Sequence, residues 1–270
     1  MAHAWCSLAK TRKMYQVDAF TDRLFAGNPA AVLVLDEPLD AELMQAIAGE
    51  NNLSETAFAV RQADGFQLRW FTPTHEAQFC GHATLATAHV LMAELEEPGP
   101  LSFHTQVGVL NVDREEAGYA LSLPNYPPEP FGSSPDWLEP LFGAGAVEAF
   151  RNFENMFVVL ASEEEVLAFQ PDMAALAGTY GIDLCVTAPG NSADFVSRYF
   201  APGAGIPEDP VTGSTHATLV PYWTAKLGKS RLTARQCSAR GGDLMCELTG
   251  DRVILFGDAV TYLRGEISLP

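Results

Sequence analysis

Three short segments of this 270-residue chain bring together side chains that take up and release protons. They are Asn52-Leu-Ser-Glu-Thr-Ala-Phe58, Gln78-Phe-Cys-Gly-His-Ala-Thr84 and Glu208-Asp-Pro-Val-Thr-Gly-Ser-Thr-His216. Glu55 in the first segment has apolar neighbours, and burial raises the pKa of a glutamate from about 4.3 toward neutrality. Such a carboxyl group can remove a proton from carbon and return it at another position. The sequence therefore indicates proton-transfer chemistry centred on Glu55.

The second and third segments each place a glycine, Gly81 or Gly213, before a predicted helix. Glycine lets the backbone approach a ligand closely, and the first N–H groups of a helix have no partner within it. Two such helix starts facing each other would bind a carboxylate through these donors and the helix dipoles. We therefore expect a small carboxylic acid as substrate, which the formal net charge of −18 would otherwise repel.

The chain also contains a copy of itself, because segments of its first half recur in order in its second half. Phe66-Gln-Leu-Arg-Trp-Phe-Thr-Pro73 matches Phe195-Val-Ser-Arg-Tyr-Phe-Ala-Pro202, Ile47-Ala-Gly49 matches Leu176-Ala-Gly178 at the same offset, and His82-Ala-Thr-Leu85 matches His216-Ala-Thr-Leu219 after a short insertion. A period this long indicates a duplicated domain rather than a solenoid. At the common offset Glu55 faces Leu184, so the carboxyl group belongs to one copy. Asn28 and Asn155 each precede an apolar run in their own copy.

Alternation and apolar runs predict similar elements in both halves. In the first half we expect strands at 14–20, 31–35, 55–61, 66–71, 101–103, 108–112 and 119–123, with helices at 41–51 and 84–95. In the second half we expect strands at 157–160, 184–187, 195–200, 231–236, 244–248 and 253–263, with helices at 172–180 and 215–227. The helix at 84–95 is apolar on nearly all sides, which is typical of a helix enclosed by a sheet. The fold class is therefore α+β.

A proline-rich stretch at 124–135 divides the halves, because proline cannot donate to a sheet ladder. We expect a disordered tail at 1–13, an N-terminal domain at 14–123, a linker at 124–135 and a C-terminal domain at 136–263. The strand at 264–270 is a candidate last strand of the N-terminal domain. A cleft between the two domains is the expected ligand site.

Composition excludes several other classes of protein. The hydrophobic fraction of 47% is that of a globular protein, and no apolar run is long enough to span a membrane. The acidic surface argues against nucleic acid as a partner. The five cysteines are scattered, with no paired metal-ligand spacing, so we expect neither a metal site nor a disulfide framework. We expect a cytoplasmic protein.

With Val17-Asp-Ala-Phe20 and Phe25-Ala-Gly-Asn-Pro29, the three segments resemble the PhzF (phenazine biosynthesis-like) family, in order from about Met14 to the C-terminus. The resemblance implies the diaminopimelate epimerase-like fold, with two pseudo-symmetric domains, each a barrel-like, mostly antiparallel sheet around a central helix. It also implies a homodimer in a biosynthetic process, and isomerisation of a small carboxylic acid without cofactor or metal. Carried over to this sequence, the catalytic residues are Glu55, His82 and Asp209, and the substrate-binding residues are Cys80, Gly81, Gly213 and Ser214.

Two other functions stay open. In related epimerases a thiol from each half acts as base and acid; Cys80 occupies the first position, but the second turn has no cysteine. The other alternative is a binding or scaffold protein that lost catalysis. Each residue also has a structural interpretation: Glu55 as a solvated strand residue, Cys80 as a small buried one, and His82, Asp209 and Ser214 as helix-start or turn residues. We assign no role to His75 and Glu76.

Overall fold

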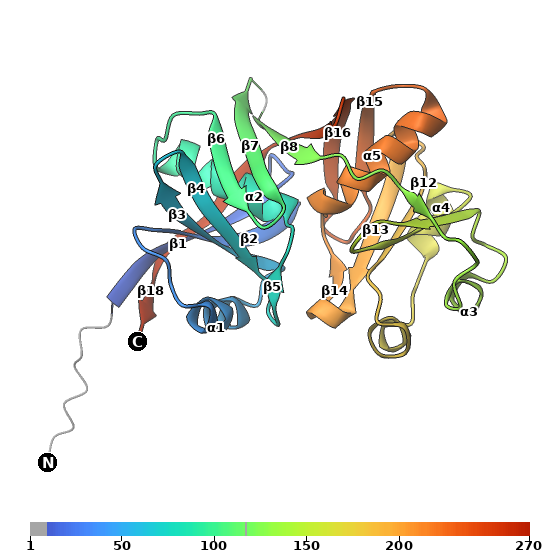
Figure 1. Ribbon diagram of the computed structural model, residues 1–270, viewed down its shortest axis with the longest axis horizontal. Helices are drawn as coiled ribbons and strands as arrows, with labels where there is room; N and C mark the ends of the chain where they lie inside the picture. The colour runs from blue at the N-terminus through green and yellow to red at the C-terminus, as the bar shows by residue number, and fades with distance from the viewer. Residues whose placement is uncertain (1–9, 117) are drawn as a thin grey trace, which may run out of the picture.

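The computed structural model describes residues 10–116 and 118–270, which form two lobes side by side (Figure 1). In each lobe a curved sheet surrounds a central helix, α2 (Gly81–His89) in the first lobe and α5 (Gly213–Leu227) in the second. This arrangement confirms the predicted α+β class and the pseudo-symmetric, barrel-like fold.

The first lobe contains β1 (Lys10–Ala19), β2 (Asn28–Leu35), α1 (Ala41–Asn51), β3 (Glu55–Gln62), β4 (Gly65–Phe71), β5 (Glu76–Ala77), α2, the π-helix η1 (Val90–Glu94), β6 (Leu101–Thr105), β7 (Gly108–Glu115) and β8 (Gly118–Pro124). The second lobe contains β9 (Glu129–Pro130), α3 (Leu138–Phe142), β10 (Glu148–Arg151), β11 (Met156–Val159), α4 (Glu163–Ala168), the π-helix η2 (Ala175–Tyr180), β12 (Leu184–Pro189), β13 (Phe195–Ala201), the 3-10 helix η3 (Pro202–Ala204), β14 (Ile206–Asp209), α5, β15 (Arg231–Gln236), β16 (Gly242–Thr249) and β17 (Arg252–Gly257). The last strand, β18 (Ala259–Leu269), returns to the first lobe.

Strand pairing repeats between the lobes. The first lobe has the order β18–β1–β2–β3–β4–β6–β7–β8, parallel at β2–β3 and β4–β6 and antiparallel elsewhere. The second lobe has the order β10–β11–β12–β13–β15–β16–β17, parallel at β11–β12 and β13–β15. β8 pairs with β17 and joins the two sheets. The duplication seen in the sequence therefore extends to the direction of every matched strand pair.

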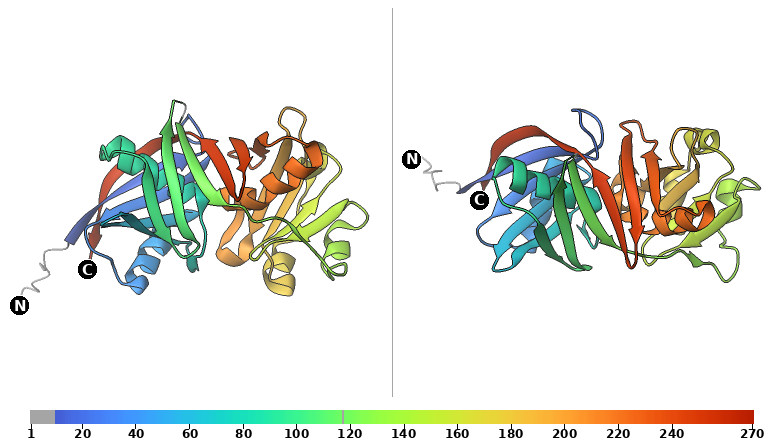
Figure 2. Two further views of the ribbon diagram at one scale, coloured as in Figure 1. Left: turned by 45° about the horizontal axis from the view of Figure 1, so that its top comes forward. Right: turned by 90° about the horizontal axis from the view of Figure 1, so that it is seen from above.

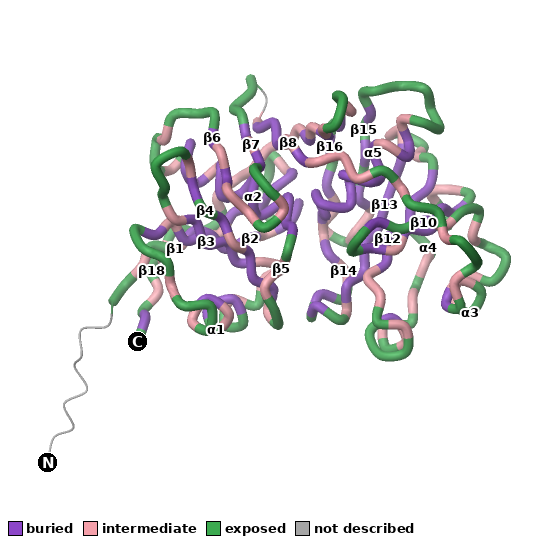
Figure 3. The backbone as a smooth tube through the Cα atoms, in the orientation of Figure 1, coloured by how far each residue is buried: buried purple, intermediate pink, exposed green. Residues whose placement is uncertain are grey.

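α2 is buried almost completely, and α5 is buried as far as Trp223 while its last turn is exposed (Figure 3). The sequence of α2 consists largely of alanine, threonine and glycine, so the surrounding strands can approach it on all sides. Its threonine hydroxyls donate to carbonyls four residues back, Thr84 to Cys80 at 2.5 Å and Thr87 to Ala83 at 2.6 Å. These hydroxyl groups are thus satisfied without water.

The proline inside α5 leaves one helix carbonyl for the connection between the lobes. Pro221 has no N–H, so the Ala217 carbonyl loses its usual partner within the helix. The backbone N–H of Tyr126, in the connection after β8, donates to this carbonyl at 3.0 Å. The sequence of α5 therefore anchors the connecting segment to the second lobe.

The arginine that recurs in the segments 66–73 and 195–202 forms an ion pair in each lobe. Arg69 binds Glu76 through two hydrogen bonds of 2.7 Å, and Arg198 binds Glu208 through bonds of 2.7 and 3.0 Å. Each pair ties a central strand to the segment that precedes its buried helix. We assigned no role to Glu76 from the sequence. In the structure it is the ion-pair partner of Arg69.

Three expectations about boundaries need correction. Lys10 to Lys13, assigned to the tail, belong to β1 because β18 supplies their hydrogen-bonding partners; residues 1–9 lie outside the described residues. The expected strand at 253–263 is two strands that separate at Asp258, and residues 259–263 pair with β1 rather than with the second lobe. Figure 2 shows β18, in red, running beside β1 in both views. The central helices begin earlier than expected, at Gly81 and Gly213.

Among the residues that the structure describes, no helix is both long and apolar enough to cross a membrane.

Candidate active site between the lobes

All seven residues that the sequence singled out line one cavity where the lobes meet. Glu55 is the first residue of β3, and Asp209 is the last residue of β14. The others stand at the helix starts: Cys80 precedes α2, Gly81 and His82 open it, and Gly213 and Ser214 open α5. The cavity measures about 60 Å³, and exposed residues at its mouth connect it to solvent.

The two helix starts lie against each other. A methyl group built on Gly81 would come within 2.9 Å of the Gly213 Cα atom, and one built on Gly213 within 3.0 Å of the Gly81 Cα atom. Any side chain here would push the helices apart, which explains the glycine in both copies. Neither helix has a side-chain N-cap bond, so backbone donors of both starts are free to bind an anion at this point.

Glu55 is a buried carboxyl group with 12% of its side-chain surface exposed. Burial raises its pKa well above 4.5, and the charges of Asp209 and Glu154 raise it further, while a hydrogen bond with Cys80 lowers it. No lysine or arginine of the described residues forms an ion pair with it. The raised pKa favours the protonated form of Glu55 relative to a solvated glutamate, which is a property of many acid–base catalysts.

His82 lies beside Glu55 as a neutral imidazole. Its Nε2 atom is 3.1 Å from the Glu55 Oε2 atom, although the two are not aligned as a hydrogen bond. Burial lowers the pKa of His82 to about 3, so the ring is uncharged at neutral pH. A neutral ring can donate a proton to one partner and accept one from another.

Asp209 reaches the site from the second lobe. Burial raises its pKa to about 6, while hydrogen bonds from Thr212 and Asn28 favour the ionised form. Thr212 Oγ1 donates to Asp209 Oδ2 at 2.5 Å, and Asn28 Nδ2 donates to Asp209 Oδ1 at 2.8 Å. The Gln236 side chain donates to the Asp209 carbonyl at 2.8 Å and fixes the turn before α5.

The Cys80 thiol also faces the cavity, 3.5 Å from His82 Nδ1. Burial and the neighbouring Glu55 raise the pKa of this thiol well above 9, so it is protonated at neutral pH. Thiols act as bases and nucleophiles in the thiolate form. Its environment is therefore unfavourable for a catalytic cysteine.

Glu55, Cys80 and His82 each offer a metal-ligating atom within 4.8 Å of the others. Glu55 approaches Nε2 of the ring, whereas Cys80 approaches Nδ1, where the Asn28 amide also donates. The three atoms are close enough to meet at one ion, although the Asn28 amide also contacts the ring at Nδ1.

Sequence reasoning missed several residues of the cavity, namely Thr72, Glu154, Asp183, Tyr199 and Thr212. Burial and Asp183 raise the pKa of Glu154 to about 7, although part of its surface stays exposed at the cavity mouth. Glu154 and Asp183 stand beside Asn155 and Leu184, so comparison with the duplicated positions could have pointed to them. His75, which had no assigned role, lines the cavity and is exposed.

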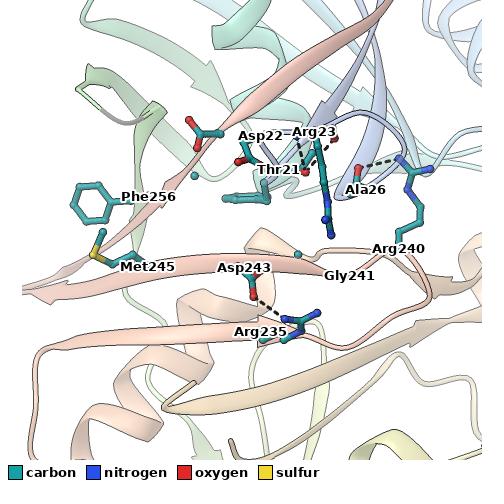
Figure 4. Close-up of a pocket in the computed structure, with 14 residues that line it drawn as sticks. Thr21, Asp22, Arg23, Ala26, Arg235, Arg240, Gly241, Asp243, Met245 and Phe256 are labelled. Carbon is teal, nitrogen blue, oxygen red and sulfur yellow. Dashed lines mark hydrogen bonds and ion pairs between the residues drawn. The ribbon is translucent and has the colours of Figure 1, made fainter. Parts of the chain in front are cut away.

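A second, larger cavity of about 590 Å³ lies apart from these residues, between the loop after β1 and the start of β16 (Figure 4). Its walls carry arginines and aspartates in equal number: Arg23, Arg235, Arg240, Asp22, Asp243 and Asp258. It contains none of the predicted catalytic side chains, so we place the chemistry in the smaller cavity.

Comparison with known proteins agrees with this geometry. Residues 17–265 match the family model described as phenazine biosynthesis-like protein. An uncharacterized isomerase of Pseudomonas aeruginosa is 50% identical over 95% of this chain and 98% of its own length. A human phenazine biosynthesis-like domain-containing protein is 39% identical over 94% of this chain and 98% of its own length.

Solved structures give the same result. A PhzF family protein of Enterococcus faecalis superimposes with a TM-score of 0.88 at 45% identity, covering 96% of this chain and all of the other. A hydroxyproline epimerase of Agrobacterium vitis, with bound trans-4-hydroxy-L-proline, superimposes with a TM-score of 0.65 at 8% identity over 96% of this chain and 93% of the other. The second likeness is one of fold alone.

Proposed function

The chain belongs to the PhzF family of phenazine biosynthesis-like proteins, and from that premise we propose that it is a cofactor-independent isomerase that moves a proton within a small carboxylic acid. Relatives named as isomerases support the general reaction class. The observation that carries the specific proposal is the raised pKa of Glu55 in the cavity between the lobes. The N-termini of α2 and α5 lie beside it, and neither has a side-chain cap.

In this proposal the helix starts bind the substrate. The carboxylate of the substrate accepts hydrogen bonds from backbone N–H groups at Gly81, Gly213 and Ser214, which the structure leaves without side-chain caps. The same donors stabilise the negative charge that develops when a proton leaves an allylic or α carbon. Because the donors are fixed by two packed helices, they need no rearrangement during the reaction.

Glu55 carries the proton. In its ionised form it removes a proton from carbon and becomes a neutral acid, and it then returns that proton to another position of the same molecule. Glu55 ends the reaction in the form in which it began, so no other reactant is required. His82 and Asp209 stabilise or relay the charge from either side, one from each lobe. A raised pKa makes the ionised form of Glu55 a stronger base than a solvated glutamate.

The test is proton exchange with solvent. Small cyclic acids and amino acids, including trans-4-hydroxy-L-proline, are incubated with the protein in D2O and examined by NMR. We expect deuterium to enter at least one of these compounds, and Glu55→Gln to abolish the exchange while the fold is preserved. Undiminished exchange in Glu55→Gln would remove Glu55 from the mechanism.

The position of Cys80 in the cavity supports a second candidate, a thiol-dependent racemase or epimerase. Iodoacetamide separates the two mechanisms. Inactivation that substrate prevents would favour the thiol, whereas indifference to the reagent favours Glu55. Binding of a small acid without any deuterium exchange would instead support a non-catalytic member of the fold.

We further propose a cytoplasmic homodimer with a role in a biosynthetic process. Cys80, Cys185, Cys237 and Cys246 are free, which suits a reducing compartment. Phe25 is 70% exposed and packs against Tyr262, which is 47% exposed, so an apolar patch is available to a second copy. Light scattering during size-exclusion chromatography gives the mass: twice 29.2 kDa supports the dimer and 29.2 kDa contradicts it.

A further inference from the structure

We propose that Asn28 is a positioning residue that holds His82 in the tautomer with its proton on Nε2, facing Glu55, and at the same time holds Asp209 of the other lobe. The inference deepens the proposed function and rests on it for its catalytic meaning. The position of the His82 proton can be measured without any substrate. Asn28 is the first residue of β2 and is fully buried.

The orientation of the Asn28 amide follows from its partners. Its Nδ2 atom lies 2.9 Å from the Val211 carbonyl oxygen, 2.8 Å from Asp209 Oδ1 and 3.1 Å from His82 Nδ1. A backbone carbonyl can only accept a hydrogen bond, so the atom that faces it must be the amide nitrogen. The opposite orientation would set the amide oxygen against two acceptors. The contact with Val211 therefore fixes which end of the amide faces the histidine.

The tautomer of His82 follows in turn. An amide nitrogen donates and does not accept, so a proton on His82 Nδ1 would face a donor. The amide has two hydrogens for three acceptors, so the contact with His82, which is the longest of the three, shares a hydrogen with one of the two oxygens. This arrangement favours a lone pair on Nδ1, and the one proton of the neutral imidazole is then on Nε2, 3.1 Å from Glu55 Oε2. The Nε2 proton faces Glu55, although the two groups are not aligned as a hydrogen bond.

The backbone before Asn28 is itself clamped by the second lobe. Arg240 donates to the carbonyls of Gly27 at 2.8 Å and Ala26 at 2.9 Å, and it pairs with the buried Asp18 at 2.8 Å. Figure 4 shows the guanidinium of Arg240 directed at Ala26. The Asn28 side chain therefore binds Asp209 of the second lobe, and Arg240 of that lobe also holds the backbone before Asn28.

The duplicate asparagine shows that this use belongs to the first lobe. Asn155 occupies the corresponding place, and its Oδ1 atom accepts a hydrogen bond from Tyr199 at 2.6 Å. The first lobe has Trp70 where the second has Tyr199, and no acceptor for the indole N–H is present among the described residues. With no hydroxyl group to bind, the Asn28 Oδ1 atom has no partner among the described residues, while its Nδ2 atom donates to Asp209 of the other lobe.

The experiment locates the proton of His82 by ¹⁵N NMR of the imidazole nitrogens in the full-length protein at neutral pH. In the wild type we expect Nδ1 to show the shift of an unprotonated nitrogen and Nε2 that of a protonated one. In Asn28→Leu, a side chain of similar size without any donor, we expect the proton to be shared between Nδ1 and Nε2. Asn28→Ala should give the same mixture of tautomers. Asn155→Leu is the matched control and should leave the His82 spectrum unchanged.

Activity gives the second readout, with whichever acid exchanges deuterium in the screen. We expect Asn28→Leu to lower kcat by about 10²-fold or more, with KM within a few fold, because general acid–base groups contribute on this scale. A wild-type His82 protonated on Nδ1 would overturn the inference, even if the variants fail to fold. Unchanged shifts in both Asn28 variants would also overturn it. Absence of exchange with every acid, with the expected wild-type tautomer, would contradict the proposed function and leave the role of Asn28 standing.

Discussion

The two lobes share a scaffold but differ at the residues that face the cavity. Both have a buried helix that begins at glycine, an arginine–glutamate pair and an asparagine near the start of an apolar strand. The first lobe has Trp70 where the second has Tyr199, and the strand register at this pair makes Asp183 the counterpart of Glu55, rather than Leu184 as the sequence offset suggested. Both carboxyl groups line the cavity, but they differ in side-chain length. Duplication thus supplied two equivalent helix starts, and a few polar substitutions made their shared cavity asymmetric, as transfer of a proton in one direction requires.

The largest expected effect tests Glu55 against an apolar control residue of the other lobe. Glu55→Gln keeps the shape of the side chain but removes its ability to ionise, so deuterium exchange should fall by a factor of about 10²–10⁴. Leu184→Met, in the apolar core of the second lobe, should leave exchange nearly unchanged because it conserves volume. Exchange rates by NMR, with circular dichroism to verify folding, give the comparison. Equal losses in the two variants would mean that Glu55 matters for packing alone.

The arginine pairs provide a stability comparison. Arg198 is 9% exposed and also donates to the Val166 and Phe169 carbonyls, whereas Arg69 is 30% exposed. Arg198→Met should therefore lower the free energy of unfolding by about 3–5 kcal/mol, because it leaves buried acceptors unpaired. Arg69→Met should lower it by about 0.5–1 kcal/mol, as for an exposed ion pair. Urea denaturation measures both, and a larger loss at Arg69 would contradict this ranking.

The carboxyl groups of the cavity predict how stability depends on pH. Burial raises the pKa of Asp209 to about 6 and of Glu154 to about 7 in the folded state, so the folded protein binds more protons than the unfolded chain between about pH 4 and 7. Stability should therefore fall as pH rises through this window. Glu154→Gln removes one of these groups and should gain stability over wild type as pH rises from about 4 to 7, with no further gain above. Thermal unfolding across this range tests the sign, and a gain that grows toward low pH would contradict it.

The smallest expected effect concerns the residues that precede the two helices. Cys80 precedes α2 and Thr212 precedes α5, so Cys80→Ser gives the first lobe a hydroxyl group like that of the second. Because the thiol is protonated at neutral pH, we expect exchange to stay within about tenfold of wild type, well below the loss of a general acid–base group. Steady-state kinetics would show complete inactivation if the thiol were the base.

Much of the fold could be predicted from the sequence because the same segments occur, in the same order, in both halves. Helix α1 has the predicted bounds, and the strand and helix patterns of both lobes follow the repeated segments. The return of the chain to the first lobe agrees with the expectation for 264–270, because β18 pairs with β1 there. The start of β18 at Ala259 could not be predicted, because the alternation of residues 259–263 does not say which lobe supplies their partner strand. The predicted start of α2 was also too late. Glycine and histidine have low helix propensity, and here packing inside the barrel, rather than propensity, stabilises the first turn.

The candidate site was predictable to a similar degree. The seven residues in the three recognised segments do line one cavity, although their individual roles stay predictions. Glu154 and Asp183 were missed because a carboxyl group in a turn has no distinctive spacing and reads as solvated. Asn28 was noticed as a repeat, but its sequence context does not reveal a bond to a residue of the other lobe.

The central claim is that Glu55 has a strongly raised pKa, and a ¹³C NMR titration of its side-chain carboxyl group tests it most directly. The resonance is identified by its loss in Glu55→Gln. We predict a midpoint well above 4.5, because the group is buried near Asp209 and has no cationic partner among the described residues. A midpoint at or below 4.5 would show an ordinary solvated carboxylate and would contradict the proposed proton transfer.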